Sequence, residues 1–135
     1  MRIGVIDTGC ANIASVRFAL ERGGLDHTVV RDPDDGQACD RMILPGVGAA
    51  GPAMTRLRAR GWDTALAADE RPLMGICLGM QMLFEHSEEG GADCLGLLSG
   101  RIERLPRDPD LVWPHMGWNA LEFEAAVRMQ ATRTR

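Results

Sequence analysis

A cysteine at position 77 stands between two glycines, Gly75 and Gly79, where an apolar run ends and a helical pattern begins. Residues 73–76 are typical of a buried strand, and the apolar spacing that follows predicts a helix through residue 85. A sharp strand-to-helix turn needs glycine on both sides, because larger side chains would collide. The stretch therefore predicts a nucleophile elbow whose backbone N–H groups favour the thiolate and a developing oxyanion. The alternative is a buried structural cysteine at a strand–helix junction.

A second glycine-rich turn, with Gly46, Gly48 and Gly51, follows the strand pattern of residues 41–44 and precedes a helix. Its spacing formally matches the dinucleotide-binding pattern G-x-G-x-x-G. That fingerprint, however, belongs to the first strand of its unit, and here a proline opens the turn and the candidate acidic residues follow a helix. We interpret the turn as a loop of exposed backbone N–H groups close to Cys77.

The elements that must position these turns alternate along the chain. Strands are expected at residues 3–6, 27–31, 41–44 and 73–76, and helices at 11–23, around 53–57 and at 62–68. This order predicts an α/β fold with a mostly parallel, doubly wound sheet and helices on both faces. Parallel strands end at one edge, so the turns after residues 6, 44 and 76 should converge there. A small antiparallel addition is expected near residues 101–123.

Composition and charge argue against several classes of protein. The chain has 135 residues, 45% of them hydrophobic, and a net charge of −4, which indicates one globular domain without a basic stripe for nucleic acid or a polybasic membrane anchor. The four cysteines (Cys10, Cys39, Cys77 and Cys94) form no C-x-x-C pair, so neither a zinc site nor a disulfide framework is predicted. With no signal-peptide pattern and no apolar run of transmembrane length, we expect a cytoplasmic protein.

Residues 112–119 contain two tryptophans, a histidine and a methionine around a proline. Trp113 and Trp118 either fill the core or form a surface for a partner protein, and the sequence leaves both interpretations open.

Four motifs together resemble one family: residues 6–12 (IDTGCAN), 44–48 (LPGVG), 75–81 (GICLGMQ) and 114–119 (PHMGWN). The chain is similar to the glutaminase subunit of imidazole glycerol phosphate synthase, a class I (triad) glutamine amidotransferase of histidine biosynthesis. The elbow is shared with amidotransferases of other pathways, whereas the last motif is nearly private to this subunit. The resemblance implies an incomplete amidotransferase domain over residues 1–123 and an atypical tail over residues 124–135.

The resemblance also implies a chemistry. Cys77 would attack the side-chain amide of glutamine, giving a tetrahedral intermediate and then a thioester, with ammonia as leaving group. The N–H of Leu78 and a backbone N–H of the Val47–Gly48 turn would form the oxyanion hole. Glutamine would be held by Gly46, Gly48 and Gln81, and no cofactor or metal is implied.

In this family a barrel-shaped cyclase subunit uses the ammonia to make imidazole glycerol phosphate and an aminoimidazole carboxamide ribotide. The resemblance therefore implies a heterodimer. The residues implied at its interface are Asn12, Pro114, His115, Met116, Gly117, Trp118 and Asn119.

The chain departs from the family after the tryptophan motif. Family members continue into a His-Pro-Glu motif that supplies the triad histidine and glutamate, and this sequence has neither, as if truncated or frame-shifted. Of its three histidines, His27 is expected at the opposite edge of the sheet, His86 about 13 Å from Cys77 along the same helix, and His115 in the partner motif. The sequence thus predicts no complete triad, turnover lowered by orders of magnitude, and an uncovered sheet edge.

Two other classes of function remain open. A non-catalytic fragment or partner-binding module would keep the interface motif without turnover. A cysteine hydrolase of another α/β lineage would keep the G-x-C-x-G elbow and act on a different substrate.

Overall fold

The computed structural model describes residues 1–106, 118 and 120. Strands and helices are interspersed along the first 81 residues, and short strands follow. No helix in this described part is long and apolar enough to cross a membrane. In chain order the elements are β1 (Ile3–Ile6), α1 (Ile13–Arg22), β2 (His27–Val30), β3 (Arg41–Gly46), α2 (Ala50–Ala59), α3 (Trp62–Ala68), β4 (Leu73–Cys77), α4 (Leu78–Gln81), β5 (His86–Ser87), β6 (Ala92–Asp93) and β7 (Arg101–Ile102).

Four strands form a parallel sheet in the order β2-β1-β3-β4. The predicted parallel α/β architecture is therefore confirmed. In the β3–β4 register Gly46 lies opposite Cys77, which brings the glycine-rich turn and the elbow to the same edge of the sheet, as expected from the strand directions.

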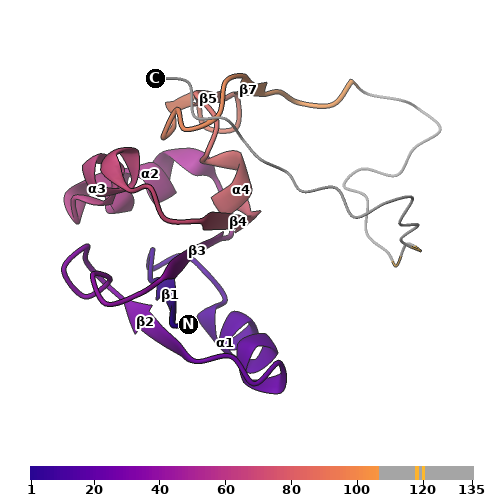
Figure 1. Ribbon diagram of the computed structural model, residues 1–135. Helices are drawn as coiled ribbons and strands as arrows, with labels where there is room; N and C mark the ends of the chain where they lie inside the picture. The colour runs from indigo at the N-terminus through magenta and orange to yellow at the C-terminus, as the bar shows by residue number, and fades with distance from the viewer. Residues whose placement is uncertain (107–117, 119, 121–135) are drawn as a thin grey trace.

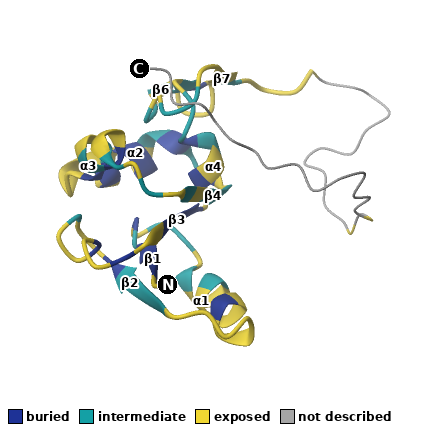
Figure 2. Ribbon diagram, in the orientation of Figure 1, coloured by how far each residue is buried: buried dark blue, intermediate teal, exposed yellow. Residues whose placement is uncertain are grey.

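Side chains alternate between the two faces of this sheet, as the period of a strand requires. Ile6, Met42 and Leu44 pack into the core beneath α2, α3 and α4. Val5 and Ile43 point the other way and pack with Leu20 of α1. Figure 1 shows α1 on one side of the sheet and α2 and α3 on the other, and Figure 2 shows the central strands β1 and β3 buried between them. Helices thus cover both faces, as predicted.

A second, small sheet in the order β6-β5-β7 follows the elbow. It differs from the predicted addition, because β5 and β6 are antiparallel whereas β5 and β7 are parallel, so the sheet is mixed. It also begins at His86, within a stretch expected to be helix and then exposed loop. Residues 107–117, 119 and 121–123, where most of the predicted addition falls, lie outside the described residues.

Helix α4 is much shorter than the pattern through residue 85 predicts. A helix through residue 85 would need the N–H groups of residues 82–85 to donate to the carbonyls of residues 78–81. The Met82 N–H does so, but those of Leu83 and Phe84 donate three residues back, and that of Glu85 donates to the distant Gly100 carbonyl. The helix therefore ends at Gln81, and the apolar pattern after it still points into the core: Met82 is buried.

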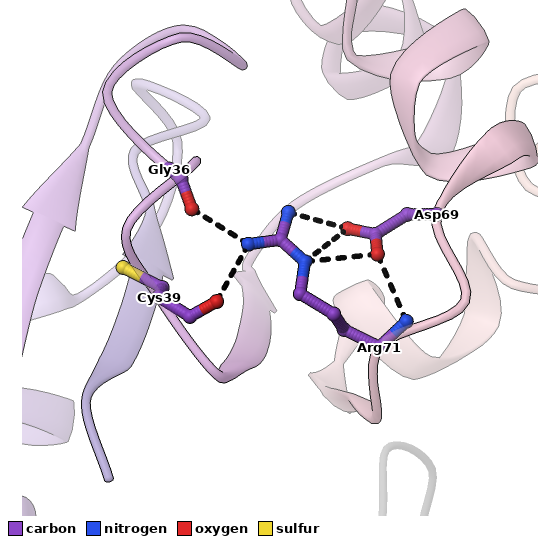
Figure 3. Close-up of polar contacts among 4 residues, drawn as sticks. All are labelled: Gly36, Cys39, Asp69 and Arg71. Carbon is purple, nitrogen blue, oxygen red and sulfur yellow. Dashed lines mark hydrogen bonds and ion pairs between the residues drawn. The ribbon is translucent and has the colours of Figure 1, made fainter.

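An arginine anchors the connection between β2 and β3 (Figure 3). Arg71, just before β4, donates from Nη1 to the carbonyls of Gly36 (2.6 Å) and Cys39 (2.7 Å), and its Nε and Nη2 bond the carboxylate of Asp69. The hydrogen bond with Asp69 raises the pKa of the Arg71 guanidinium above its ordinary value. This anchor lies at the amino edge of the sheet, opposite Cys77, and is structural.

Arg71→Lys is expected to lower the free energy of unfolding by about 1–2 kcal/mol, because lysine keeps the charge but cannot donate in the planar fork that reaches both carbonyls and the carboxylate. Urea denaturation followed by tryptophan fluorescence measures the change. Arg17→Lys is the matched control: Arg17 makes one exposed pair with Glu21 at 3.6 Å, so a change within about 0.5 kcal/mol is expected. Equal losses of unfolding free energy in the two variants would contradict a structural role for the Arg71 contacts.

Strand β4 is at the end of the described sheet and carries Met74, whose relative exposure is 60%. An exposed apolar edge strand promotes association with other chains, and a charged residue there prevents it. In the 135-residue chain, Met74→Lys is expected to raise the soluble concentration severalfold with a change in unfolding free energy below about 0.5 kcal/mol. Light scattering against protein concentration measures this, with Phe18→Lys on helix α1, where Phe18 is similarly exposed, as control. An unchanged aggregation onset would show that this edge is not the cause.

Candidate active site

Cys77 has the backbone geometry of a nucleophile elbow. It lies at the junction of β4 and α4 with φ 55° and ψ −119°, and is the one non-glycine residue with positive φ among the described residues. Such geometry costs on the order of 1–3 kcal/mol and persists where the surrounding structure enforces it. The side chain is exposed, so the alternative of a buried structural cysteine is wrong.

The two flanking glycines are required by close packing. A Cβ at Gly75 would lie 2.5 Å from the Cα of Met80, and a Cβ at Gly79 would overlap the carbonyl oxygen of Leu44. Each glycine therefore lets one side of the turn approach the other: α4 approaches β4 at Gly75 and β3 at Gly79.

The glycine-rich turn lies beside the elbow. Gly46 pairs with Cys77, and Gly48 has φ +89°. Between them, Val47 is exposed, and its N–H donates to the carbonyl of Cys10 at 2.8 Å. In this conformation the Val47 N–H is thus occupied by the loop after β1 rather than directed to a substrate.

The helix that follows Cys77 is a single turn, so its dipole is smaller than the long predicted helix would provide. Leu78 begins this turn, and the first N–H groups of a helix have no intrahelical acceptor. Gln81 ends it, and its side-chain Oε1 is buried without a hydrogen-bond partner among the described residues. A buried amide oxygen without a donor is costly, which suits a group that receives its donor from a ligand.

The two described histidines lie away from this arrangement. His27 begins β2, at the amino edge as expected, and its Nδ1 lies 3.0 Å from the carbonyl of Leu25. The expectation that His86 continues the helix after Cys77 is wrong: it lies in β5, where its Nδ1 is 3.0 Å from Asp93 Oδ1. His115 lies outside the described residues.

Two of the residues implied at a partner interface are described. Asn12 is exposed and caps α1, with its side chain accepting from the N–H of Ser15 at 3.2 Å. Trp118 is fully exposed, which argues against the interpretation that it fills the core. The remaining ones, Pro114, His115, Met116, Gly117 and Asn119, lie outside the described residues, as does Trp113.

Sequence reasoning missed two arginines behind the glycine-rich turn. Arg56 of α2 donates to the carbonyl of Gly9 at 2.6 Å, and Arg60, which caps the same helix, donates to the carbonyl of Asp7 at 2.6 Å. Both contacts are with backbone, so no pairing of residue types in the sequence could indicate them. The arginine spacing of four along a helix was the available signal.

Comparison with known proteins places this arrangement in a family. Residues 4–123 match the family described as "Glutamine amidotransferase class-I". The chain belongs to the class I glutamine amidotransferases. The family predicted from the motifs is confirmed, and the matched residues include both the glycine-rich turn and Cys77.

The more specific likeness is to one subunit. The "Imidazole glycerol phosphate synthase subunit HisH" of Xanthomonas campestris pv. campestris (strain 8004) is 55% identical over 119 residues, covering 88% of this chain and 60% of that protein. The protein of the same name from Xylella fastidiosa (strain Temecula1 / ATCC 700964) is 52% identical over the same shares. The chain thus spans 60% of the length of these curated relatives.

The fold is also found in a solved structure. "Crystal structure of glutamine amidotransferase" superposes with a TM-score of 0.64 at 21% identity, covering 73% of this chain and 54% of the other. At that identity the likeness supports the fold, an α/β sheet with helices, and nothing finer.

Proposed function

We propose that this chain is the glutaminase subunit of imidazole glycerol phosphate synthase, with Cys77 as nucleophile. The thiolate attacks the side-chain amide carbon of glutamine, the C–N bond breaks, and the nitrogen leaves as ammonia after gaining a proton. Water then hydrolyses the thioester to glutamate and restores the thiol. The observation that carries the proposal is the exposed Cys77 at φ 55° in a chain 55% identical to such a subunit.

The backbone around Cys77 supplies the oxyanion donors in this proposal. Leu78 offers the first N–H of α4, and Gly48 offers one from the neighbouring turn. Val47 serves as a donor only after its N–H leaves the Cys10 carbonyl. Gln81, with its unpartnered Oε1, accepts a hydrogen bond from the glutamine substrate, and the backbone at Gly46 and Gly48 forms the floor beneath it.

The ammonia passes to a cyclase subunit, which uses it to make imidazole glycerol phosphate and an aminoimidazole carboxamide ribotide. We place the interface at Asn12 and residues 114–119. The full exposure of Trp118 supports this, because exposed tryptophan is typical of the centre of a protein interface. A cytoplasmic location belongs to the same proposal, and four free cysteines support a reducing compartment.

The 135-residue chain, as it stands, is proposed to turn over glutamine slowly. Of the described histidines, His27 begins β2 at the amino edge of the sheet and His86 lies in β5 of the small second sheet, so neither belongs to the strand edge that carries Cys77. Without a base, activation of the thiol and protonation of ammonia both suffer, which typically costs orders of magnitude in rate.

A glutaminase assay with purified cyclase subunit tests the proposal. Slow ammonia release that requires glutamine and disappears in Cys77→Ser supports it. Binding to the cyclase with no release would instead favour a non-catalytic binding module. Hydrolysis of a simple ester without glutaminase activity, together with no modification of Cys77 by the glutamine analogue 6-diazo-5-oxo-norleucine, would favour a cysteine hydrolase of another lineage.

A further inference from the structure

The loop after β1 is held to α2 by two arginines that lie one helical turn apart. Arg56 and Arg60 donate to the carbonyls of Gly9 and Asp7. Four residues of helix rise about 6 Å and bring both arginines to one face of α2, so their guanidinium groups reach two carbonyls of the same loop. The side chain of Arg56 also lies along the loop: a Cβ at Gly9 would be 3.7 Å from its Nη1.

The same loop makes the contact with the glycine-rich turn. The residue after Gly9 is Cys10, whose carbonyl accepts the N–H of Val47. A hydrogen bond within the loop also fixes its turn: the Oδ1 of Asp7 accepts from the Gly9 N–H at 2.9 Å. A continuous set of contacts thus leads from α2 through residues 7–10 to Val47, and α2 itself begins three residues after Val47.

We propose that Arg56 and Arg60 are positioning residues that hold the backbone of residues 7–10, so that the Cys10 carbonyl retains the Val47 N–H. This structural role rests on the contacts alone. By holding that N–H, the two arginines also set how often Val47 can donate to an oxyanion at Cys77, and this consequence rests on the proposed function. A charged donor makes a stronger hydrogen bond than a neutral one, so removing either guanidinium loosens the loop.

Amide hydrogen exchange, measured residue by residue on the full 135-residue chain, tests the first part. In Arg56→Gln the exchange rate of the Val47 N–H is expected to rise at least about fivefold, and in Arg56→Gln with Arg60→Gln further still, while the Val5 N–H of the central strand changes less than twofold. The matched control is Arg58→Gln, on the same helix, because Arg58 donates to the carbonyl of Asp93 at 2.8 Å, away from the loop. An unchanged Val47 rate, or an equal rise in Arg58→Gln, would overturn the proposal.

Arg56→Lys guards against a variant that fails to fold. Lysine keeps one charged donor, so the rise in the Val47 exchange rate should be less than half of that in Arg56→Gln. If only the lysine variant folds, its Val47 exchange rate should be about twice that of the unsubstituted chain. A lysine variant in which Val47 exchange is unchanged, with the glutamine variant unfolded, would count against the proposal.

A chemical readout separates positioning from general loosening. We compare the rate at which Cys77 reacts with 6-diazo-5-oxo-norleucine, whose carbonyl benefits from an oxyanion donor, with its rate for iodoacetamide, which measures access to the thiol. The ratio is expected to rise at least threefold in Arg56→Gln and to stay within twofold in Arg58→Gln. A ratio unchanged in Arg56→Gln contradicts the consequence for the oxyanion. No labelling of the unsubstituted chain by the diazo ketone would instead contradict the proposed function and leave the exchange result to decide the positioning role.

Discussion

Replacement of Cys77 by alanine is expected to lower covalent labelling by 6-diazo-5-oxo-norleucine by at least about three orders of magnitude, to the background set by the other thiols. The exposed side chain on a positive-φ turn, next to the backbone of the glycine-rich turn, is the one thiol placed for a glutamine-like electrophile among those described. Intact-mass spectrometry followed by peptide mapping measures both the extent and the position of labelling.

The other cysteines supply the controls. Burial raises the pKa of the Cys94 thiol, so less of it is thiolate at neutral pH and Cys94→Ala should leave labelling within twofold. Cys39 is buried, and Cys39→Ala should behave in the same way. Persistent labelling in Cys77→Ala, or its loss in Cys94→Ala, would mean that the electrophile recognises a different site.

Gly79→Ala is expected to be the most damaging small substitution in the described fold. The added Cβ would overlap the carbonyl oxygen of Leu44 and lie 3.2 Å from the carbonyl carbon of Pro45, both backbone atoms of strand β3. The backbone of a central strand cannot move aside without breaking its pairing, so we expect a loss of at least about 3 kcal/mol of unfolding free energy. Domains of this size have about 5–15 kcal/mol in total, so a large share of the stability is at risk.

Gly51→Ala is the matched control, because it adds the same methyl group within helix α2, where the nearest atom outside the helix is the Gly90 carbonyl oxygen at 3.7 Å. Alanine favours a helix over glycine, so a gain of up to about 1 kcal/mol is expected. Urea denaturation of both variants, monitored by circular dichroism, gives the two values. A Gly79→Ala chain as stable as the parent would show that the elbow can open without cost.

The parallel sheet was predictable because its strands are local and strongly patterned. Residues 3–6 and 41–44 are short apolar runs that are buried apart from Arg41, as is typical of a parallel sheet covered on both faces, and helix α3 begins and ends where its apolar pattern does. The direction of parallel strands then required Gly46 and Cys77 to meet at one edge. A single glycine on each side of Cys77 indicated the elbow for the same local reason.

Contacts between distant segments decided the rest. The end of α4 depends on the Glu85 N–H donating to the distant Gly100 carbonyl rather than to Gln81, and nothing within residues 78–85 carries that information. The parallel pairing of β7 with β5 likewise depends on backbone contacts between distant segments, which the residue types of the two strands do not specify.

The sequence by itself determined the family, the cysteine of the elbow and the two glycines that its turn requires, because each depends on residue type at fixed spacing. Only the tertiary structure decided that Val47 donates to Cys10, and that Arg56 and Arg60 hold the loop that accepts it. Those contacts end on backbone carbonyls, which every residue possesses. Residue identity cannot specify which carbonyl is taken, and only the packing of α2 against the loop after β1 selects it.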